Sequence, residues 1–147
     1  MNIKIRKAEI YDLKTVTELC MTLYEVRDFD YLENENKRLL ENKNQAVFLV
    51  FDGVNAVAFA HCSLRFDYVE ATSSSPVGYL EGIYIEPDFR KQDIAKQLVN
   101  TCENWAKGNG CTEFASDCDL TNEESYKFHL KIGFIEANRN IHFTKGL

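Results

Sequence analysis

The sequence predicts a single α+β domain, residues 1–147, in which helices cover both faces of a mixed sheet. Two observations lead to this prediction. Stretches rich in β-branched and aromatic residues alternate along the chain with stretches whose apolar residues recur at helical spacing. In addition, residues 77–116 read as strand, helix and strand, and a helical crossover of this kind joins parallel strands. At 147 residues, the chain suits one sizeable hydrophobic core.

The first part of the chain predicts a short strand and two helices. Ile3 and Ile5 alternate with polar residues, which is typical of a strand with one apolar face. Asp12 is placed to cap the first helix. The apolar stripe of that helix is Leu13, Val16, Leu19, Cys20 and Leu23. After a polar loop, a second helix is expected from about Tyr31 to Glu41.

A β-hairpin is predicted around the Asp52-Gly53 pair, because this dipeptide favours the tight turns that join antiparallel strands. Its two strands are expected at residues 46–51 and 56–66. The polar, serine-rich residues 67–76 then read as a loop that leads into the next strand.

The centre of the chain predicts a strand that feeds directly into a long helix. Residues 77–85 form a β-branched and aromatic run, which Glu86-Pro87 ends because proline lacks a backbone donor. The apolar stripe of a helix begins at Ile94, and Gly108 and Gly110 provide its end. Arg90, Lys91 and the first helical amides face the connecting loop, so they form a candidate site for a pyrophosphate.

The last part of the chain predicts a strand, a helix and a closing strand. Residues 111–116 should lie parallel to the central strand, and Thr121 with Glu124 fits a capping box for a helix that runs to about Lys131. Gly133 would stop this helix. The closing strand is expected from Phe134 to about Thr144.

Composition excludes some classes of partner. The net charge of −6 argues against nucleic acid and against an anionic membrane surface, and it is compatible with a cationic ligand. The N-terminus lacks the apolar core of a signal peptide, so a cytoplasmic location is expected. The five cysteines include no Cys-x-x-Cys pair, which favours small buried hydrophobic residues over a metal site or a disulfide framework.

Several stretches together resemble a known family. Residues 90–95, Arg-Lys-Gln-Asp-Ile-Ala, resemble the loop with which GNAT N-acetyltransferases hold the pyrophosphate of acetyl-coenzyme A. The Ser-Pro-Val and Leu-Glu-Gly-Ile-Tyr sequences at residues 75–77 and 80–84 are similar to those of aminoglycoside 6′-N-acetyltransferases. The same holds for residues 111–117 and for Ile-Gly-Phe at residues 132–134. The resemblance implies the fold of that family, in which two parallel strands of the sheet splay apart and four helices flank it.

The resemblance also implies acetyl-coenzyme A as the co-substrate, with no metal. Its acetyl and pantetheine groups would bond to the backbone of the central strand, and its pyrophosphate to the loop and the start of the helix. The residues implied are Ile83, Tyr84, Ile85, Arg90, Lys91, Gln92, Asp93, Ile94, Ala95, Lys96 and Asn122. Asp93 departs from the family, which has a glycine there. A carboxylate at this position adds a side chain and a like charge beside the phosphates.

Three side chains are candidates for the chemistry of acetyl transfer. Glu81 lies amid apolar strand residues, where it either faces solvent at an edge or faces the acceptor and takes a proton from its amine. Asp117 follows the parallel strand and either caps a turn or orients the acceptor. His129 lies four residues before Gly133, where many members of the family carry a tyrosine, so the resemblance implies that it is the acid that protonates the departing thiolate. An imidazole can donate a proton near neutral pH, and the alternative is a structural helix residue.

The acceptor itself is predicted to be a cation. Tyr24 and Tyr68 would stack against a sugar ring while Glu81, Asp117 and Glu136 bind its amines. The resemblance therefore implies an acetyltransferase for the 6′-amine of aminoglycosides, and it also implies a homodimer. Two alternatives stay open. One is another amine as acceptor, such as a polyamine, an amino acid or a protein N-terminus. The other is a protein that binds the aminoglycoside or coenzyme A without turnover, because of Asp93.

Overall fold

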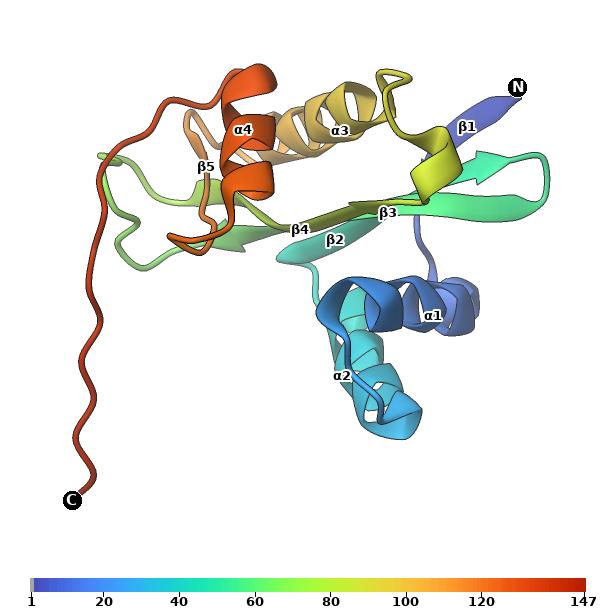
Figure 1. Ribbon diagram of the computed structural model, residues 1–147, viewed down its shortest axis with the longest axis horizontal. Coiled ribbons are helices and arrows are strands. Elements are labelled where there is room, and N and C mark those ends of the chain that lie inside the picture. The colour runs from blue at the N-terminus through green and yellow to red at the C-terminus, as the bar shows by residue number, and fades with distance from the viewer. Residues whose placement is uncertain (1) are drawn as a thin grey trace.

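The computed structural model describes residues 2–147, which form one five-stranded sheet between two layers of helices (Figure 1). The strands lie in the order β1-β2-β3-β4-β5, and all neighbours are antiparallel except the parallel pair of β4 and β5. The elements in chain order are β1 (Ile3–Lys7), α1 (Leu13–Tyr24), α2 (Phe29–Glu41), β2 (Gln45–Asp52), β3 (Asn55–Arg65), β4 (Val77–Ile85), α3 (Ile94–Gly108), β5 (Phe114–Ser116) and α4 (Glu123–Lys131).

Two hydrophobic cores lie on opposite faces of the sheet. On one face α1 and α2 cover a core that includes Val16, Leu49 and Phe59. On the other face α3 covers a second core, with Leu98 and Cys102 fully buried, and α4 lies beside α3 (Figure 1). The alternation of the strands therefore sends successive side chains into two different layers, which confirms the predicted α+β sandwich of helices and sheet.

Four cysteines, Cys20, Cys62, Cys102 and Cys111, are buried, and Cys118 is half-buried. All five are free thiols, as the sequence predicts for small hydrophobic residues. Burial raises the pKa of the Cys20 thiol to about 11, although a hydrogen bond from Asn36 opposes the shift. This cysteine is therefore a packing residue and not a reactive thiolate.

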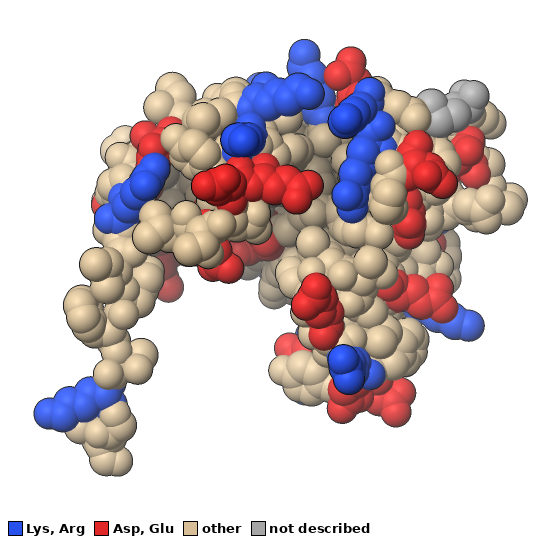
Figure 2. All heavy atoms as spheres, in the orientation of Figure 1, with Lys and Arg blue, Asp and Glu red and all other residues tan. Residues whose placement is uncertain are grey.

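The predicted closing strand at residues 134–144 is wrong. The chain leaves α4 as an extended tail without strand pairing, and the tail reaches away from the body of the molecule (Figures 1 and 2). Its apolar residues Ile135, Ile141 and Phe143 are 90%, 79% and 88% exposed. Their spacing gives the strand pattern, but a strand also needs a partner edge, and the tail has none within residues 2–147.

One predicted cap is wrong, and the other, Asp12, holds the N-cap position of α1 without a side-chain cap bond. Asn122, and not Thr121, caps α4 and accepts a hydrogen bond from the backbone of Ser125. Asp12 precedes α1, but its carboxylate accepts from the backbone N–H of Glu9 and pairs with Arg6 at 2.7 Å, so it holds the start of a short 3-10 helix against β1. Beyond these ends, the predicted helices and strands form, with bounds that shift by one to three residues.

Candidate active site

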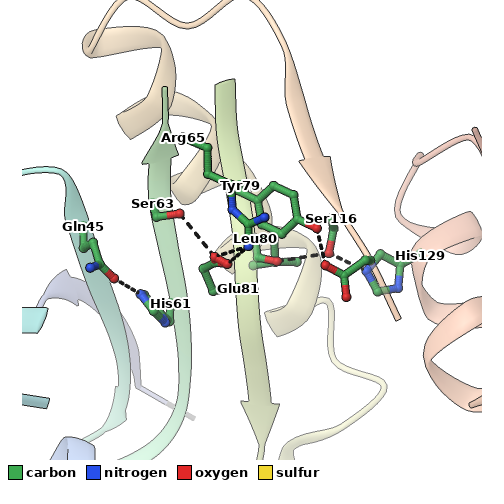
Figure 3. Close-up of polar contacts among 10 residues, drawn as sticks. Gln45, His61, Ser63, Arg65, Tyr79, Leu80, Glu81, Ser116 and His129 are labelled. Atoms are coloured by element: carbon green, nitrogen blue, oxygen red, sulfur yellow. Dashed lines mark hydrogen bonds and ion pairs between the residues drawn. The ribbon is translucent and has the colours of Figure 1, made fainter. Parts of the chain in front are cut away.

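Glu81 lies at a bulge in the middle of β4. His61 of β3 pairs with Gly82, and Cys62 pairs with Leu80, so Glu81 has no partner on β3. An extra residue of this kind turns the strand and redirects side chains. Here the carboxylate of Glu81 accepts a 3.3 Å hydrogen bond from Ser63, and its two oxygens accept from Nη2 of Arg65 (Figure 3). The bulge therefore presents a half-buried carboxylate, which is already paired with a cation, on the sheet face that α1 covers.

Tyr24 lies near the same carboxylate, and Asp117 is linked to it through Tyr79 and Arg65. The hydroxyl of Tyr79 on β4 donates to Asp117, and burial followed by this bond raises the pKa of Tyr79, which keeps its proton. Tyr24 ends α1, and a Cβ at Gly82 would collide with its hydroxyl. Burial, with the charges of Cys20 and Glu81, raises the pKa of Tyr24 to about 12. The structure thus brings together three sequence-predicted residues, Glu81, Asp117 and Tyr24.

The parallel strands separate next to these residues. β4 and β5 share three register pairs, the last of which is Leu80 with Ser116. Beyond this pair, residues 83–85 pair only with β3. Because the Glu86 N–H bonds to Val57 of β3, the alternation of an antiparallel pair turns the Tyr84 N–H toward β3 and the Ile83 and Ile85 N–H groups toward the open side. Unpaired amides in a strand are the donors that a carbonyl oxygen or a pantetheine amide requires. This separation is the splay that the resemblance implies.

His129 on α4 faces Ser116 at this point of separation. The imidazole Nε2 is 2.8 Å from Oγ of Ser116, which also lies 3.1 Å from the carbonyl of Leu80 (Figure 3). The other nitrogen, Nδ1, lies 2.7 Å from the backbone oxygen of Ser125 and must donate its proton there. Neutral His129 therefore carries its free lone pair on Nε2, toward Ser116.

The predicted phosphate site lies in the loop between β4 and α3. Nε of Arg90 donates to the carbonyl of Ile85 at 2.8 Å, which ties the loop to the end of β4. Lys91 and Asp93 both have the left-handed backbone, with φ of 65° and 61°. Turns of this kind aim backbone N–H groups at an anion, and the N-terminus of α3 adds its dipole. The exposed side chains of Lys91 and Lys96 supply positive charge beside them.

Asp93→Gly should tighten coenzyme A binding and raise the melting temperature. Asp93 caps α3 with left-handed backbone and no side-chain hydrogen bond, and it makes no ion pair with Lys91 or Lys96 within residues 2–147. Glycine relieves a strain of about 1 kcal/mol and removes a charge that repels the phosphates. Isothermal titration with coenzyme A measures the gain.

Asp93→Asn is the matched control, because asparagine removes the charge and keeps the side chain. A gain with glycine and not with asparagine would assign the effect to the backbone, and equal gains would assign it to charge. No gain with either variant would mean that the loop tolerates the carboxylate by turning it to solvent.

The other predicted site residues have local partners and lie outside this cluster of contacts. The side chain of Tyr68 is 75% exposed, and its hydroxyl accepts from the backbone of Ala71. Glu136 lies at the start of the tail, where it bonds to Tyr126 and Arg139. Asn122 accepts the bond that caps α4. Their predicted contacts with the acceptor and with coenzyme A stay predictions.

Sequence reasoning missed Arg65 and Ser116. Arg65 is a charged residue at the end of a strand, where the pattern suggests only a solvated position, and its link to Glu81 depends on the pairing of β3 with β4. Ser116 carries no signal of its own, and only the register with Leu80 and the position of α4 reveal its contact with His129. Within residues 2–147, no group of three or more histidine, cysteine, aspartate or glutamate side chains is arranged to hold a metal ion.

Comparisons with known proteins agree with this geometry. Residues 10–134 match the model of the acetyltransferase (GNAT) family. An aminoglycoside N(6′)-acetyltransferase type 1 from Acinetobacter haemolyticus is 39% identical over 145 residues, which are 99% of this chain and 98% of that protein. AAC(6′)-Iy, solved with the bisubstrate analogue CoA-S-monomethyl-acetylneamine, has a TM-score of 0.94 at 33% identity and covers 100% of both chains.

A second solved structure, the aminoglycoside 6′-N-acetyltransferase AAC(6′)-Ih from Acinetobacter baumannii, has a TM-score of 0.93 at 33% identity over 99% of each chain. The family model spans most of the chain, and these relatives span nearly all of it. The chain belongs to the GNAT family of acetyltransferases.

Proposed function

We propose that this protein transfers the acetyl group of acetyl-coenzyme A to the 6′-amine of aminoglycosides. The observation that carries the proposal is the juxtaposition of Glu81, Asp117 and Tyr24 with the point where β4 and β5 separate. Carboxylates beside an aromatic ring suit an amino sugar, and the free backbone of β4 suits an acyl carbonyl. Relatives of nearly full length, named for this activity, support the same conclusion.

The reaction needs a base, donors for the oxyanion and an acid. Acetyl-coenzyme A supplies the acetyl group when it is bound. Glu81, directly or through water, takes a proton from the amine, and the amides of Ile83 and Ile85, which face away from β3, stabilise the negative charge on the carbonyl oxygen. Asp117, fixed by Tyr79, orients the acceptor through a second ammonium group.

Proton delivery to the departing thiolate falls to Ser116 and His129. When His129 is charged, Nε2 donates to Ser116, and the Ser116 hydroxyl then donates to the thiolate as it takes the proton of Nε2. The step leaves a free thiol, an intact serine and a neutral imidazole that keeps its proton on Nδ1. The distances from Nε2 of His129 to Oγ of Ser116 and from Nδ1 to the Ser125 carbonyl, 2.8 and 2.7 Å, support this relay, in which the Ser116 hydroxyl turns from the Leu80 carbonyl to the thiolate.

The test of the proposed function is the release of coenzyme A thiol by the purified protein with a panel of acceptors. Kanamycin and tobramycin contain a 6′-amine, whereas spermidine and a lysine peptide offer primary amines on flexible chains. We expect release with the two aminoglycosides and little with the others. Release with spermidine or the peptide alone would replace the proposed acceptor. If no acceptor causes thiol release while titration shows that aminoglycosides bind, the result would favour binding without turnover.

The extended tail supports a homodimer as part of the proposal. Its exposed residues Ile135, Ile141 and Phe143 have strand spacing without a partner, and β5 forms an open edge of the sheet. Two copies can give each tail a partner and cover the open edge at β5 if each tail packs on the other copy. This is a closed two-fold arrangement. The tail would then be ordered by the second copy.

Sedimentation velocity should therefore find a dimer for the wild-type protein and a monomer for Ile141→Asp combined with Phe143→Asp. The two aspartates place charge on the apolar positions that the second copy would bury. Asn140→Asp is the matched control, because it adds charge at a polar position of the same segment, and it should stay dimeric. A wild-type monomer at tens of micromolar would contradict the proposed dimer.

A further inference from the structure

The guanidinium of Arg65 occupies the place next to Glu81. Arg65 is the last residue of β3, and its Nη2 contacts both oxygens of the Glu81 carboxylate, at 2.8 Å for Oε2. Its Cζ lies 3.4 Å from the centroid of the Tyr79 ring, so that the cation covers the aromatic face (Figure 3). Desolvation opposes the charge of Arg65, but the bond to Glu81 and the nearby charges of Glu81 and Asp117 raise its pKa above the usual value.

These contacts are the ones that a cationic sugar would make. An ammonium group needs a carboxylate, and the apolar face of a sugar needs an aromatic ring. Tyr79 is only 6% exposed, and Arg65 lies over its ring. We infer that the Arg65 guanidinium occupies the acceptor subsite in the free protein. The acceptor must displace this guanidinium from Glu81 and Tyr79 before its amine can be acetylated.

The displacement is feasible because the guanidinium of Arg65 is partly solvated. The side chain of Arg65 is 43% exposed, against 20% for Glu81, so the guanidinium can turn into water while the carboxylate exchanges one cation for another. Partly solvated ion pairs contribute little net stability, and the exchange keeps Glu81 paired throughout.

The same contact assists product release. Acetylation converts the ammonium group into a neutral amide, which no longer pairs with a carboxylate. The Glu81 carboxylate then has no ammonium group to pair with, and Arg65 is the nearest cation that can pair with it in place of the substrate. Arg65 therefore lowers the affinity for every ligand that fills the subsite, substrate and product alike, and leaves coenzyme A binding unaffected. This inference rests on the proposed function.

Arg65→Gln should lower the dissociation constant of kanamycin about two- to fivefold, the range expected from the loss of a competing exposed ion pair. Isothermal titration without acetyl-coenzyme A measures this binding, and the inhibition constant of 6′-N-acetylkanamycin should fall by a similar factor. The dissociation constant of coenzyme A should stay unchanged. Arg38→Gln is the matched control, because Arg38 pairs with Glu35 on the exposed side of α2 and its loss changes net charge equally.

Weaker or unchanged binding of kanamycin to Arg65→Gln would overturn the inference and would make Arg65 a clamp that orients Glu81. Arg65→Lys is the second variant, should glutamine prevent folding. Lysine keeps the charge but loses the two-oxygen contact and the planar stacking. The Arg65→Lys variant should therefore bind kanamycin more tightly than the wild type and less tightly than Arg65→Gln. Because titration does not require turnover, a protein that binds without thiol release would refute the proposed function and still test Arg65.

Discussion

Glu81→Gln is expected to lower kcat by about 100- to 1000-fold, the contribution that a positioned general base commonly makes. Glutamine is nearly isosteric, so it can still accept bonds from Ser63 and Arg65, but it cannot take a proton from the amine. The acceptor KM should rise as well, because the ammonium group loses its counter-charge. Steady-state thiol release at saturating acetyl-coenzyme A gives both constants.

The dependence on pH separates the base from a merely structural residue. As pH rises, the free amine needs no base to lose its proton, so the deficit of Glu81→Gln should shrink. A structural defect would persist at every pH. Glu18→Gln, an exposed carboxylate on α1, removes the same charge from the surface and should retain the wild-type constants. An unchanged kcat in Glu81→Gln would remove Glu81 from the role of base.

The fold was largely predictable because its elements are defined by local patterns. The helical stripe after Ile94 and the hairpin at Gly53 each follow from spacing and turn chemistry within a few residues. The tail shows where this reasoning stops. Ile141 and Phe143 have the spacing of a strand, yet a strand forms only where an edge is available, and the sequence of one chain does not specify an edge on another.

The site was predictable where a residue carries its own chemical signal. Glu81 stands out as a carboxylate in an apolar run, and His129 stands out by its place four residues before Gly133, where the resemblance implies an acid. The partners of these residues depend on register. The bulge that skips Glu81 places it beside Arg65, and the last pair of β4 and β5 places Ser116 beside His129. Long-range pairings of this kind leave no periodic trace in the sequence.

Ser116→Ala is expected to lower kcat about 10- to 100-fold, because the thiolate would have to leave without the proton that Ser116 passes from His129. His129→Gln should have a similar effect, and the double variant should be no slower than either single one, since both act in one relay. Ser116→Thr, which keeps the hydroxyl, should recover most of the rate. Ser125→Ala is the control, because Nδ1 of His129 bonds to the backbone oxygen of Ser125, which the substitution retains.

The acetyl selenoester of seleno-coenzyme A distinguishes an acid from a packing residue. A selenolate is a far weaker base than a thiolate and leaves without a proton, so the substitution of Ser116 or His129 should cost little with this donor. A packing defect would slow both donors equally, because it changes the site and not the leaving group. Equal losses with the thioester and the selenoester would therefore remove the relay and leave protonation of the thiolate to water at the open side of β4.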